Sequence, residues 1–256
     1  PSHVFLLTIN YRIKNHMSFF SFFSSKKNLL DTNCLDGMSD VHCHLLPDVD
    51  DGSFSVANTL EMLDYLEHEV GFKRMYFTPH VMEDFSKNNR AYLTGRFDSF
   101  LKEYKGSVQL SLASEYMLDA RFKDHLDEGL FTLGGKYVLV ETSYFAPSPQ
   151  FNELIYEIKA RGLVPMIAHP ERYAYMDESD YRQLKDMGVK FQINLPSIAG
   201  MYGNRIKKKA MFLMREQAIA YIGTDIHSYS IFQKFICTSI TKNIQNCLID
   251  SQTVIV

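Results

Sequence analysis

Short runs of β-branched and aromatic residues alternate with segments of helical periodicity from residue 41 to residue 223. Parallel strands need a crossover between them, so this alternation predicts about seven β-α units with helices covering a parallel sheet. The expected strands are 41–44, 74–78, 108–114, 137–141, 163–168, 190–194 and 218–223. The expected helices are 53–69, 91–104, 149–161, 178–187, 204–215 and a C-terminal helix with Ile236, Ile240, Ile244 and Leu248 on one stripe.

This pattern leaves two architectures open, an open doubly wound sheet and a sheet closed into a barrel. The chain has 256 residues, and we expect one domain over 38–256. Residues before Met17 show no periodicity. We therefore expect 1–37 to be an N-terminal extension, partly artefactual or poorly ordered, with Met17 as a sensible start.

Charge and cysteine content exclude several classes of protein. The 27 Lys and Arg against 30 Asp and Glu give no basic field, so nucleic-acid binding is not expected. The N-terminal apolar runs, 4–9 and 19–23, are much shorter than the roughly 20 residues of a membrane span, so no membrane insertion is expected. The four Cys form no CxxC pair, which argues against a disulfide framework or a thiolate zinc site and favours a cytoplasmic location.

Residues that can bind metals gather at the ends of the expected strands. His42 and His44 are two apart, so both imidazoles face the same side of a strand while Cys43 faces the other. Asp50 and Asp51 follow in a turn closed by Gly52, and this turn is counted as one candidate carboxylate. The remaining candidates are His80, Glu115, Glu141, His169, Asp225 and His227. Any one of them alone would be unremarkable, but their joint position at six strand ends predicts a metal centre, because functional groups collect at the carboxyl ends of parallel strands.

The number and type of these candidates constrain the metal. One first-row cation takes about four to six ligands, so nine candidates indicate two or three divalent ions that share carboxylates. Imidazole and carboxylate without thiolate suit Mn²⁺, Fe or Zn²⁺, and the sequence leaves these three open.

Four motifs contain most of these candidates. They are Asp40-Val41-His42-Cys43-His44 with Asp50-Asp51-Gly52, then Thr78-Pro79-His80, His169-Pro170-Glu171-Arg172-Tyr173 and Gly223-Thr224-Asp225-Ile226-His227. Together they resemble the motifs of the PHP (polymerase and histidinol phosphatase) superfamily, and more narrowly those of the manganese-dependent protein-tyrosine phosphatases of bacterial capsule and exopolysaccharide clusters. The resemblance implies a single-domain distorted (β/α)7 barrel of the PHP type. It also implies up to three metals, held by His42, His44, Asp51, His80, Glu115, Glu141, His169, Asp225 and His227.

The expected function is hydrolysis of phosphotyrosine by a metal-bridging hydroxide, on a polysaccharide-export tyrosine kinase as protein substrate. Arg172 follows the candidate ligand His169 by three residues and is the expected catalytic group, because its planar fork matches phosphoryl oxygens. The resembled phosphatases carry a second arginine after the Asp-x-His pair. Here 228–234 contains none, and Lys234 is the nearest cation.

Two alternative functions remain open from the sequence. One is a PHP phosphoesterase for a small metabolite such as histidinol phosphate, or an exonuclease, which the lack of a basic stripe disfavours. The other is a weakened phosphotyrosine-binding module, suggested by the missing second arginine. The oligomeric state is left open.

Overall fold

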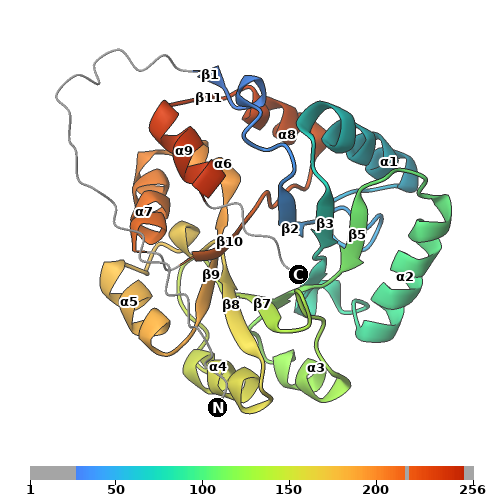
Figure 1. The fold of residues 1–256 in the computed structure, drawn as a ribbon. Coiled ribbons are helices and arrows are strands. Elements are labelled where there is room, and N and C mark those ends of the chain that lie inside the picture. Colours follow the sequence, from blue (N-terminus) through green and yellow to red (C-terminus); the bar gives the residue numbers. More distant parts are fainter. Residues whose placement is uncertain (1–26, 217–218, 251–256) are drawn as a thin grey trace, which may run out of the picture.

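The computed structural model describes residues 27–216 and 219–250, and its strands alternate with helices along the chain (Figure 1). The strands are β1 Lys27–Asn28, β2 Ser39–Cys43, β3 Arg74–Phe77, β4 His80–Val81, β5 Gln109–Leu112, β6 Glu115–Met117, β7 Tyr137–Glu141, β8 Val164–Ala168, β9 Lys190–Asn194, β10 Ile219–Gly223 and β11 Ser239–Ile240. The α-helices are α1 Val56–Tyr65, α2 Arg90–Glu103, α3 Phe122–Glu128, α4 Phe151–Ala160, α5 Glu178–Asp186, α6 Leu195–Ala199, α7 Asn204–Arg215, α8 Tyr229–Ile236 and α9 Lys242–Asp250.

The parallel strands form a closed barrel, so the barrel alternative is correct. One sheet has the order β2-β3-β5 and the other β10-β9-β8-β7-β6-β4. The two sheets are continuous, because β4 follows β3 as a second segment of the same barrel strand, and β6 follows β5 in the same way. The nine parallel strands in the described residues therefore form a barrel of seven strands. The ring closes between β2 and β10, where the N–H of Asp225 donates to the carbonyl of His42 at 2.7 Å and the N–H of His44 to that of Ile226 at 2.9 Å.

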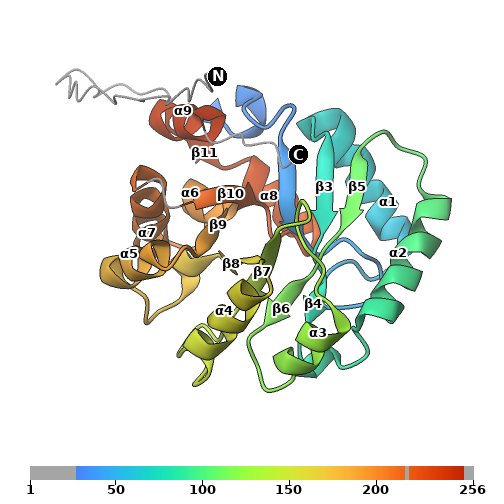
Figure 2. The ribbon, with the colours of Figure 1, turned by 60° about the horizontal axis from the view of Figure 1, so that its bottom comes forward.

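The interruption of the strand after β3 lies at Thr78-Pro79. Proline has no backbone N–H to donate to a neighbouring strand, so regular pairing breaks at this point. Pairing resumes directly, since the N–H of Glu115 donates to the carbonyl of Pro79 at 3.1 Å. Two predicted strands are therefore bent, which gives the barrel its distorted form (Figure 2).

Helices α1 to α5 and α7 lie on the outside of the barrel (Figure 1). Helix α1 begins after Ser55, an N-cap residue whose hydroxyl accepts the N–H of Asn58 at 3.2 Å. Leu93, Phe97 and Phe100 of α2 are buried, whereas Leu101 is 40% exposed. No helix in the described part of the chain has both the length and the apolar character needed to cross a membrane.

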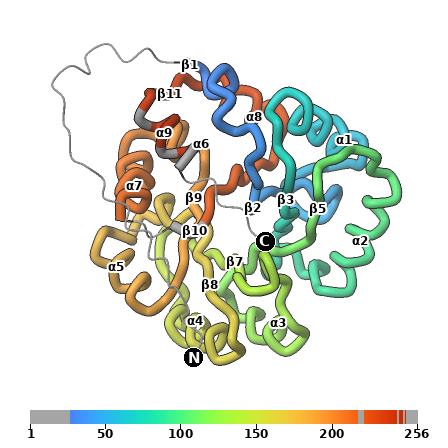
Figure 3. The backbone as a smooth tube through the Cα atoms, in the orientation of Figure 1, coloured from blue at the N-terminus to red at the C-terminus, as the bar shows by residue number. Residues whose placement is uncertain are grey.

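The C-terminal segment differs from the single predicted helix. Helix α8 ends at Ile236, β11 follows, and α9 begins at Lys242. The predicted apolar stripe is nevertheless buried, from Ile236 at 0% to Leu248 at 1% exposure. The chain leaves the helix at β11 because this strand pairs antiparallel with β1, which joins the two ends of the domain (Figure 3).

Residues 27–37 belong to the packed body of the domain. Leu29, Cys34 and Leu35 are buried in the main core, and the N–H of Leu29 donates to the carbonyl of Thr238 at 3.1 Å. The domain therefore starts earlier than the expected boundary at residue 38. The expected extension over 1–26 lies outside the described residues.

Candidate metal centre

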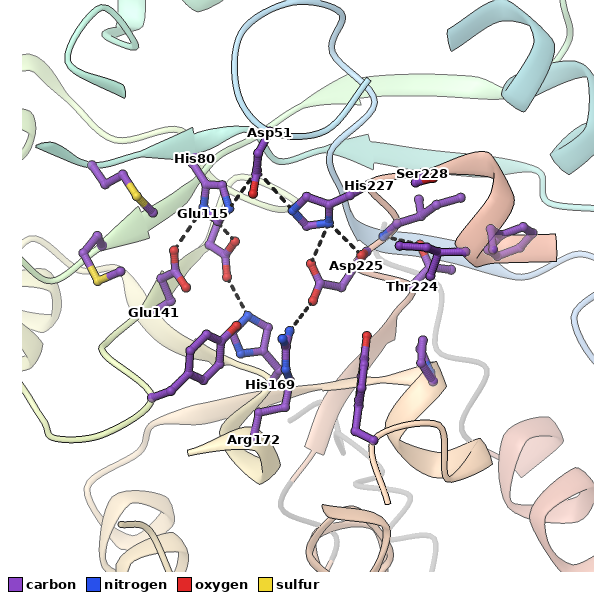
Figure 4. A pocket seen from close by; sticks show the side chains of 18 of the residues that line it. Asp51, His80, Glu115, Glu141, His169, Arg172, Thr224, Asp225, His227 and Ser228 are labelled. Atoms are coloured by element: carbon purple, nitrogen blue, oxygen red, sulfur yellow. Dashed lines mark hydrogen bonds and ion pairs between the residues drawn. The ribbon is translucent and has the colours of Figure 1, made fainter. Parts of the chain in front are cut away.

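The nine predicted ligands meet at the carboxyl end of the barrel. A cavity of about 560 Å³ is found there. Its polar lining includes Asp51, His80, Glu115, Glu141, His169, Arg172, Asp225 and His227. Figure 4 shows these side chains directed toward one another around a common centre. Residues from six strand ends are thereby brought within reach of shared ions, as the alternation of strands and helices predicted.

The end of β2 supplies two buried imidazoles, and their Nε2 atoms lie 3.1 Å apart. The Nδ1 atom of His42 lies 2.8 Å from Oε1 of Gln192, and that of His44 lies 2.8 Å from Oδ2 of Asp50. Such contacts fix ring orientation and leave Nε2 free to bind a metal. Cys43 faces the opposite side and packs in the core, as predicted.

Four groups of side chains place their ligand atoms within 4.8 Å of one another. The groups are His44 with Asp51, His80 and His227; His42 with Glu115 and His169; His42 with His44 and Asp225; and His80 with Glu115 and Glu141. All nine predicted ligands are included, and several belong to more than one group. Shared ligands are the arrangement expected of two or three ions in one centre.

Glu115 occupies the middle of these groups. Its Oε2 lies 3.1 Å from Nε2 of His42, 3.3 Å from that of His44 and 3.2 Å from Nδ1 of His80. Its Oε1 lies 3.0 Å from Nε2 of His169. The side chain is fully buried, and it belongs to two of the four groups of possible ligands.

Several buried atoms of the centre have no hydrogen-bond partner. They are Nδ1 of His80, Oε2 of Glu115, Oε1 of Glu141 and Nδ1 of His169. The first three are in ion-pair contact without forming a hydrogen bond, since Nδ1 of His80 lies 3.2 Å from Oε2 of Glu115 and 3.0 Å from Oε1 of Glu141. An unpaired buried polar atom costs about 1–3 kcal/mol, and such atoms are rare in native proteins. Divalent cations would bind these nitrogen and oxygen atoms as ligands, and the mixture of imidazole and carboxylate suits Mn²⁺, Fe or Zn²⁺. The residues present therefore fit the metals that the sequence predicted.

Electrostatics within the centre also favour bound positive charge. Burial disfavours the charged form of His42, but the Glu115 and Asp225 carboxylates outweigh burial and raise the pKa of His42 to about 10. Burial likewise opposes protonation of His80, yet Glu141 and Glu115 raise its pKa to about 10. Without metals the carboxylates thus retain protons on the imidazoles, and bound cations would displace those protons.

The backbone is strained or crowded where it presents these ligands. His169 and Asp225 have positive φ angles of 34° and 54°, which are uncommon outside glycine. A Cβ atom at Gly223 would lie 2.6 Å from the Cβ of His42, so only glycine allows the strand before Asp225 to approach β2 this closely.

Arg172 lies at the edge of the centre, on the 3₁₀ turn Pro170–Arg172. Its Nη1 donates to Oδ2 of Asp225 at 2.7 Å. The guanidinium lies between two aromatic rings, 4.7 Å from the ring centre of Tyr144 and 4.9 Å from that of Tyr202. Arg172 is thus held in one orientation beside a candidate ligand, with further N–H groups available to an anion in the cavity.

Comparison with known proteins identifies the family. The model of the family described as "Capsular polysaccharide synthesis, CpsB/CapC" matches residues 38–238. The chain belongs to this family. It is 28% identical to the tyrosine-protein phosphatase YwqE of Bacillus subtilis over 198 residues, covering 75% of this chain and 78% of that protein. It is 26% identical to the tyrosine-protein phosphatase CpsB of Streptococcus pneumoniae over 203 residues, covering 75% and 83%.

Solved structures give the same fold. Crystal structures described as YwqE from Bacillus subtilis and CpsB from Streptococcus pneumoniae, "unique metal-dependent tyrosine phosphatases", include a chain with a TM-score of 0.69 at 24% identity, covering 85% of this chain and 96% of that one. Histidinol phosphate phosphatase from Lactococcus lactis, solved with zinc, L-histidinol and phosphate, gives a TM-score of 0.52 at 15% identity, covering 84% and 93%. The predicted membership among the tyrosine phosphatases of bacterial capsule clusters and the predicted PHP-type barrel are confirmed.

The site of this CpsB/CapC chain also contains residues that the sequence did not single out. Gln192 and Asn194 lie at the end of β9, and Nδ2 of Asn194 donates to Oδ2 of Asp225 at 2.7 Å. They could have been predicted, because two polar residues at alternate positions of a buried strand face the same side. Tyr144 and Tyr202 lie in loops and show no such pattern.

Lys234 does not take the place of the second arginine. It is exposed on α8 and does not line the cavity. Arg172 is the single Lys or Arg among the described residues that line it. Any group that supplements Arg172 at the phosphate must therefore be of another kind.

Proposed function

We propose that this chain is a metal-dependent tyrosine-protein phosphatase of capsular polysaccharide synthesis, and that its substrate is a phosphotyrosine protein, namely a tyrosine kinase of polysaccharide export. The observation that carries the proposal is the cluster of buried imidazole and carboxylate groups at one cavity beside a fixed arginine, several of whose atoms make no hydrogen bond. The phosphatase names of the relatives YwqE and CpsB support the same activity.

The nine residues His42, His44, Asp51, His80, Glu115, Glu141, His169, Asp225 and His227 hold two or three divalent ions, with Mn²⁺ as the first candidate and Fe or Zn²⁺ as alternatives. Bound divalent ions supply Lewis acidity, which lowers the pKa of water and offsets charge on the phosphoryl group. The chain orients these ligands from behind, because Gln192 fixes His42 and Asp50 fixes His44. Each imidazole thus presents a defined nitrogen to the cavity.

Arg172 is the catalytic cation in this proposal. Its stacking between Tyr144 and Tyr202 restricts the guanidinium before substrate arrives, so little conformational entropy is lost on binding. The planar fork can donate to two phosphoryl oxygens and so stabilises the charge that develops in the transition state.

An apolar wall of the cavity favours an aromatic substrate. The side chains Met82, Phe85, Met117, Phe232 and Phe235 line the cavity together with the polar residues. A phenyl ring would be buried against this wall, whereas a polar metabolite gains little from it. A phenolate leaving group has a pKa near 10, so it departs with little help from a general acid.

The proposal is tested with the Mn²⁺-loaded protein. We expect hydrolysis of p-nitrophenyl phosphate and of a phosphotyrosine peptide, loss of both with EDTA, and far slower hydrolysis of histidinol phosphate. Iodoacetamide should leave the activity intact, since Cys34 and Cys43 are buried and the exposed Cys237 does not line the cavity. Inactivation by alkylation but not by chelation would refute the metal mechanism. Tight phosphopeptide binding without phosphate release under Mn²⁺, Fe²⁺ or Zn²⁺ would favour the binding module.

Elemental analysis of the protein as purified tests the metals separately. Two or three ions per chain are expected. A content below one ion per chain after reconstitution with each of the three metals would contradict the proposed centre.

A further inference from the structure

A second, smaller cavity of about 140 Å³ lies beside the metal centre, and Arg172 lines both. Arg205 and Lys209 of α7 also line the smaller cavity, so three cationic residues contribute to its lining. Glu171 is the acidic residue in its lining, but this side chain is fully buried, and its Oε1 accepts the N–H of Asn194 at 3.0 Å. The accessible part of this cavity is therefore cationic.

The positive charge of Arg205 and Lys209 on α7 is only partly offset within the described part of the chain, where Asp177, Glu171 and Asp180 act on Lys209 without forming an ion pair. The helix contains five Lys and Arg and no Asp or Glu. Arg205 donates to the carbonyl of Ala174 at 3.2 Å, and Lys209 to that of Tyr173 at 2.6 Å. Neither makes an ion pair with a carboxylate within 4.0 Å in the described residues. Carbonyl oxygens orient these side chains but leave their charges available to an anion.

This charge is unfavourable for the isolated domain. Cations in the first turns of a helix oppose its dipole, so Arg205 and Lys209 do not stabilise α7 through it. Burial and the neighbouring Arg205 together lower the pKa of Lys209, which reflects the repulsion between the two cations. An anion held between them would relieve that repulsion.

Charge around the main cavity is one-sided. Asp51 and the exposed Asp84 line it together with Arg172, whereas Arg205 and Lys209 lie beyond Arg172 in the smaller cavity. An acidic substrate segment is therefore attracted on the α7 side and repelled on the side of Asp84. Arg172 lines both cavities, so the phosphate and a second anion would lie within the reach of a few residues of extended chain, roughly 3.3–3.6 Å each.

We propose that the cavity lined by Arg172, Arg205 and Lys209 binds a second anionic group of the substrate, a carboxylate or a phosphate on a residue next to the phosphotyrosine. This subsite rests on the proposed phosphatase function and specifies its substrate as an acidic or multiply phosphorylated segment. It also provides a second cationic contact near the site, where Arg172 is the single Lys or Arg among the described residues that line the main cavity.

The test compares four substrates of the full-length Mn²⁺-loaded protein. They are p-nitrophenyl phosphate, a phosphotyrosine peptide with neutral neighbours, the same peptide with Glu at either neighbouring position, and the same peptide with a second phosphotyrosine. We expect kcat/KM to be roughly three- to tenfold higher for the anionic peptides, mainly through KM, as for one or two exposed ion pairs. The preference should shrink between about 0.05 M and about 0.5 M salt.

Two substitutions test whether the preference for anionic peptides depends on the smaller cavity. Arg205→Gln and Lys209→Gln retain a donor for the carbonyl groups but lose the charge, so the ratio of anionic to neutral peptide should fall toward one. Lys190→Gln is the matched control, because Lys190 is exposed at the opposite, amino end of β9. A response to Glu and to phosphate alike indicates a general anion subsite, and a response to the second phosphotyrosine alone indicates a phosphate subsite.

Two results would overturn the subsite while p-nitrophenyl phosphate is still hydrolysed. One is equal kcat/KM for neutral and anionic peptides in the wild-type protein, which needs no variant. The other is an anionic preference that survives in the Arg205→Gln/Lys209→Gln protein. If the wild-type protein hydrolyses none of the four substrates, the proposed phosphatase function itself fails.

Discussion

Replacement of Arg172 by alanine removes a cation whose position the structure defines closely. The change deletes the 2.7 Å contact to Oδ2 of Asp225 and empties the space between the Tyr144 and Tyr202 rings. Asp225 stays oriented, because Nδ2 of Asn194 still donates to the same oxygen at 2.7 Å. The metal content should therefore be retained while the phosphoryl group loses its donor.

The expected loss in kcat follows from the number of hydrogen-bond donors that the phosphoryl group loses. Removal of one preorganised donor to a transition state costs about 100- to 1,000-fold in kcat, or about 2.7–4 kcal/mol. Arg172 is the single Lys or Arg among the described residues of the cavity lining, so no neighbouring cation compensates. Arg172→Lys keeps the charge but loses the planar fork and most of the stacking, so we expect an intermediate kcat.

The assay is steady-state hydrolysis of p-nitrophenyl phosphate together with elemental analysis of each variant. Arg182→Ala is the matched control, since Arg182 also makes carboxylate contacts and lies 5.1 Å over the ring of Phe212, but it lines neither cavity. An unchanged kcat in Arg172→Ala, or a fall that parallels loss of metal, would show that Arg172 does not act on the phosphoryl group.

Three further predictions concern the metal centre and its loops. Glu115→Gln replaces the carboxylate that contacts four imidazoles, so it should lower the metal content by at least one ion per chain and abolish hydrolysis; full metal content would contradict its proposed role as a ligand. In EDTA-treated protein, His42 and His80 have pKa values raised to about 10, above the usual 6.5 of an unfolded histidine. The protonated imidazoles of His42 and His80 stabilise the fold fully below pH 6.5, and this stabilisation is lost as pH rises through about 10. The Tm of the metal-free protein should therefore fall over this range. The Tm of the metal-loaded protein should not fall over this range. Equal falls in Tm for the metal-free and metal-loaded proteins would contradict the prediction. Gly52→Ala would bring a Cβ against the carbonyl oxygen of His44, with an expected loss of about 1–3 kcal/mol in the free energy of unfolding. The control Gly95→Ala, in open space on α2, should raise it by about 0.5–1 kcal/mol, and denaturant titration of both proteins measures the contrast.

Most strand and helix positions were predictable because local patterns set them. The expected strand at 137–141 is β7 as predicted, and that at 190–194 is β9. The breaks between β3 and β4 and between β5 and β6 were not predicted as such, although Pro79 marks one of them. The single helix expected around residue 240 is interrupted, because the pairing of β11 with β1 outweighs the local helical pattern of apolar residues.

The candidate ligands were predictable for a different reason. His42-x-His44 and Asp225-x-His227 are spaced so that both members face one side, and the remaining candidates follow strands whose carboxyl ends meet. The structure brings all nine together. Their role as ligands remains a prediction for elemental analysis and substitution to test.

The sequence by itself determined the alternation of strands and helices, the convergence of imidazole and carboxylate at one end of the barrel, and the choice of Arg172, because spacing within a strand and the direction of parallel strands are local properties. Only the tertiary structure decided that the sheet closes, that Asn194 and Arg172 share one oxygen of Asp225, and that Arg205 and Lys209 lie beside the site. These depend on contacts between residues far apart in the chain, from 31 positions for Asn194 and Asp225 to 183 for His42 and Asp225, which no local pattern encodes.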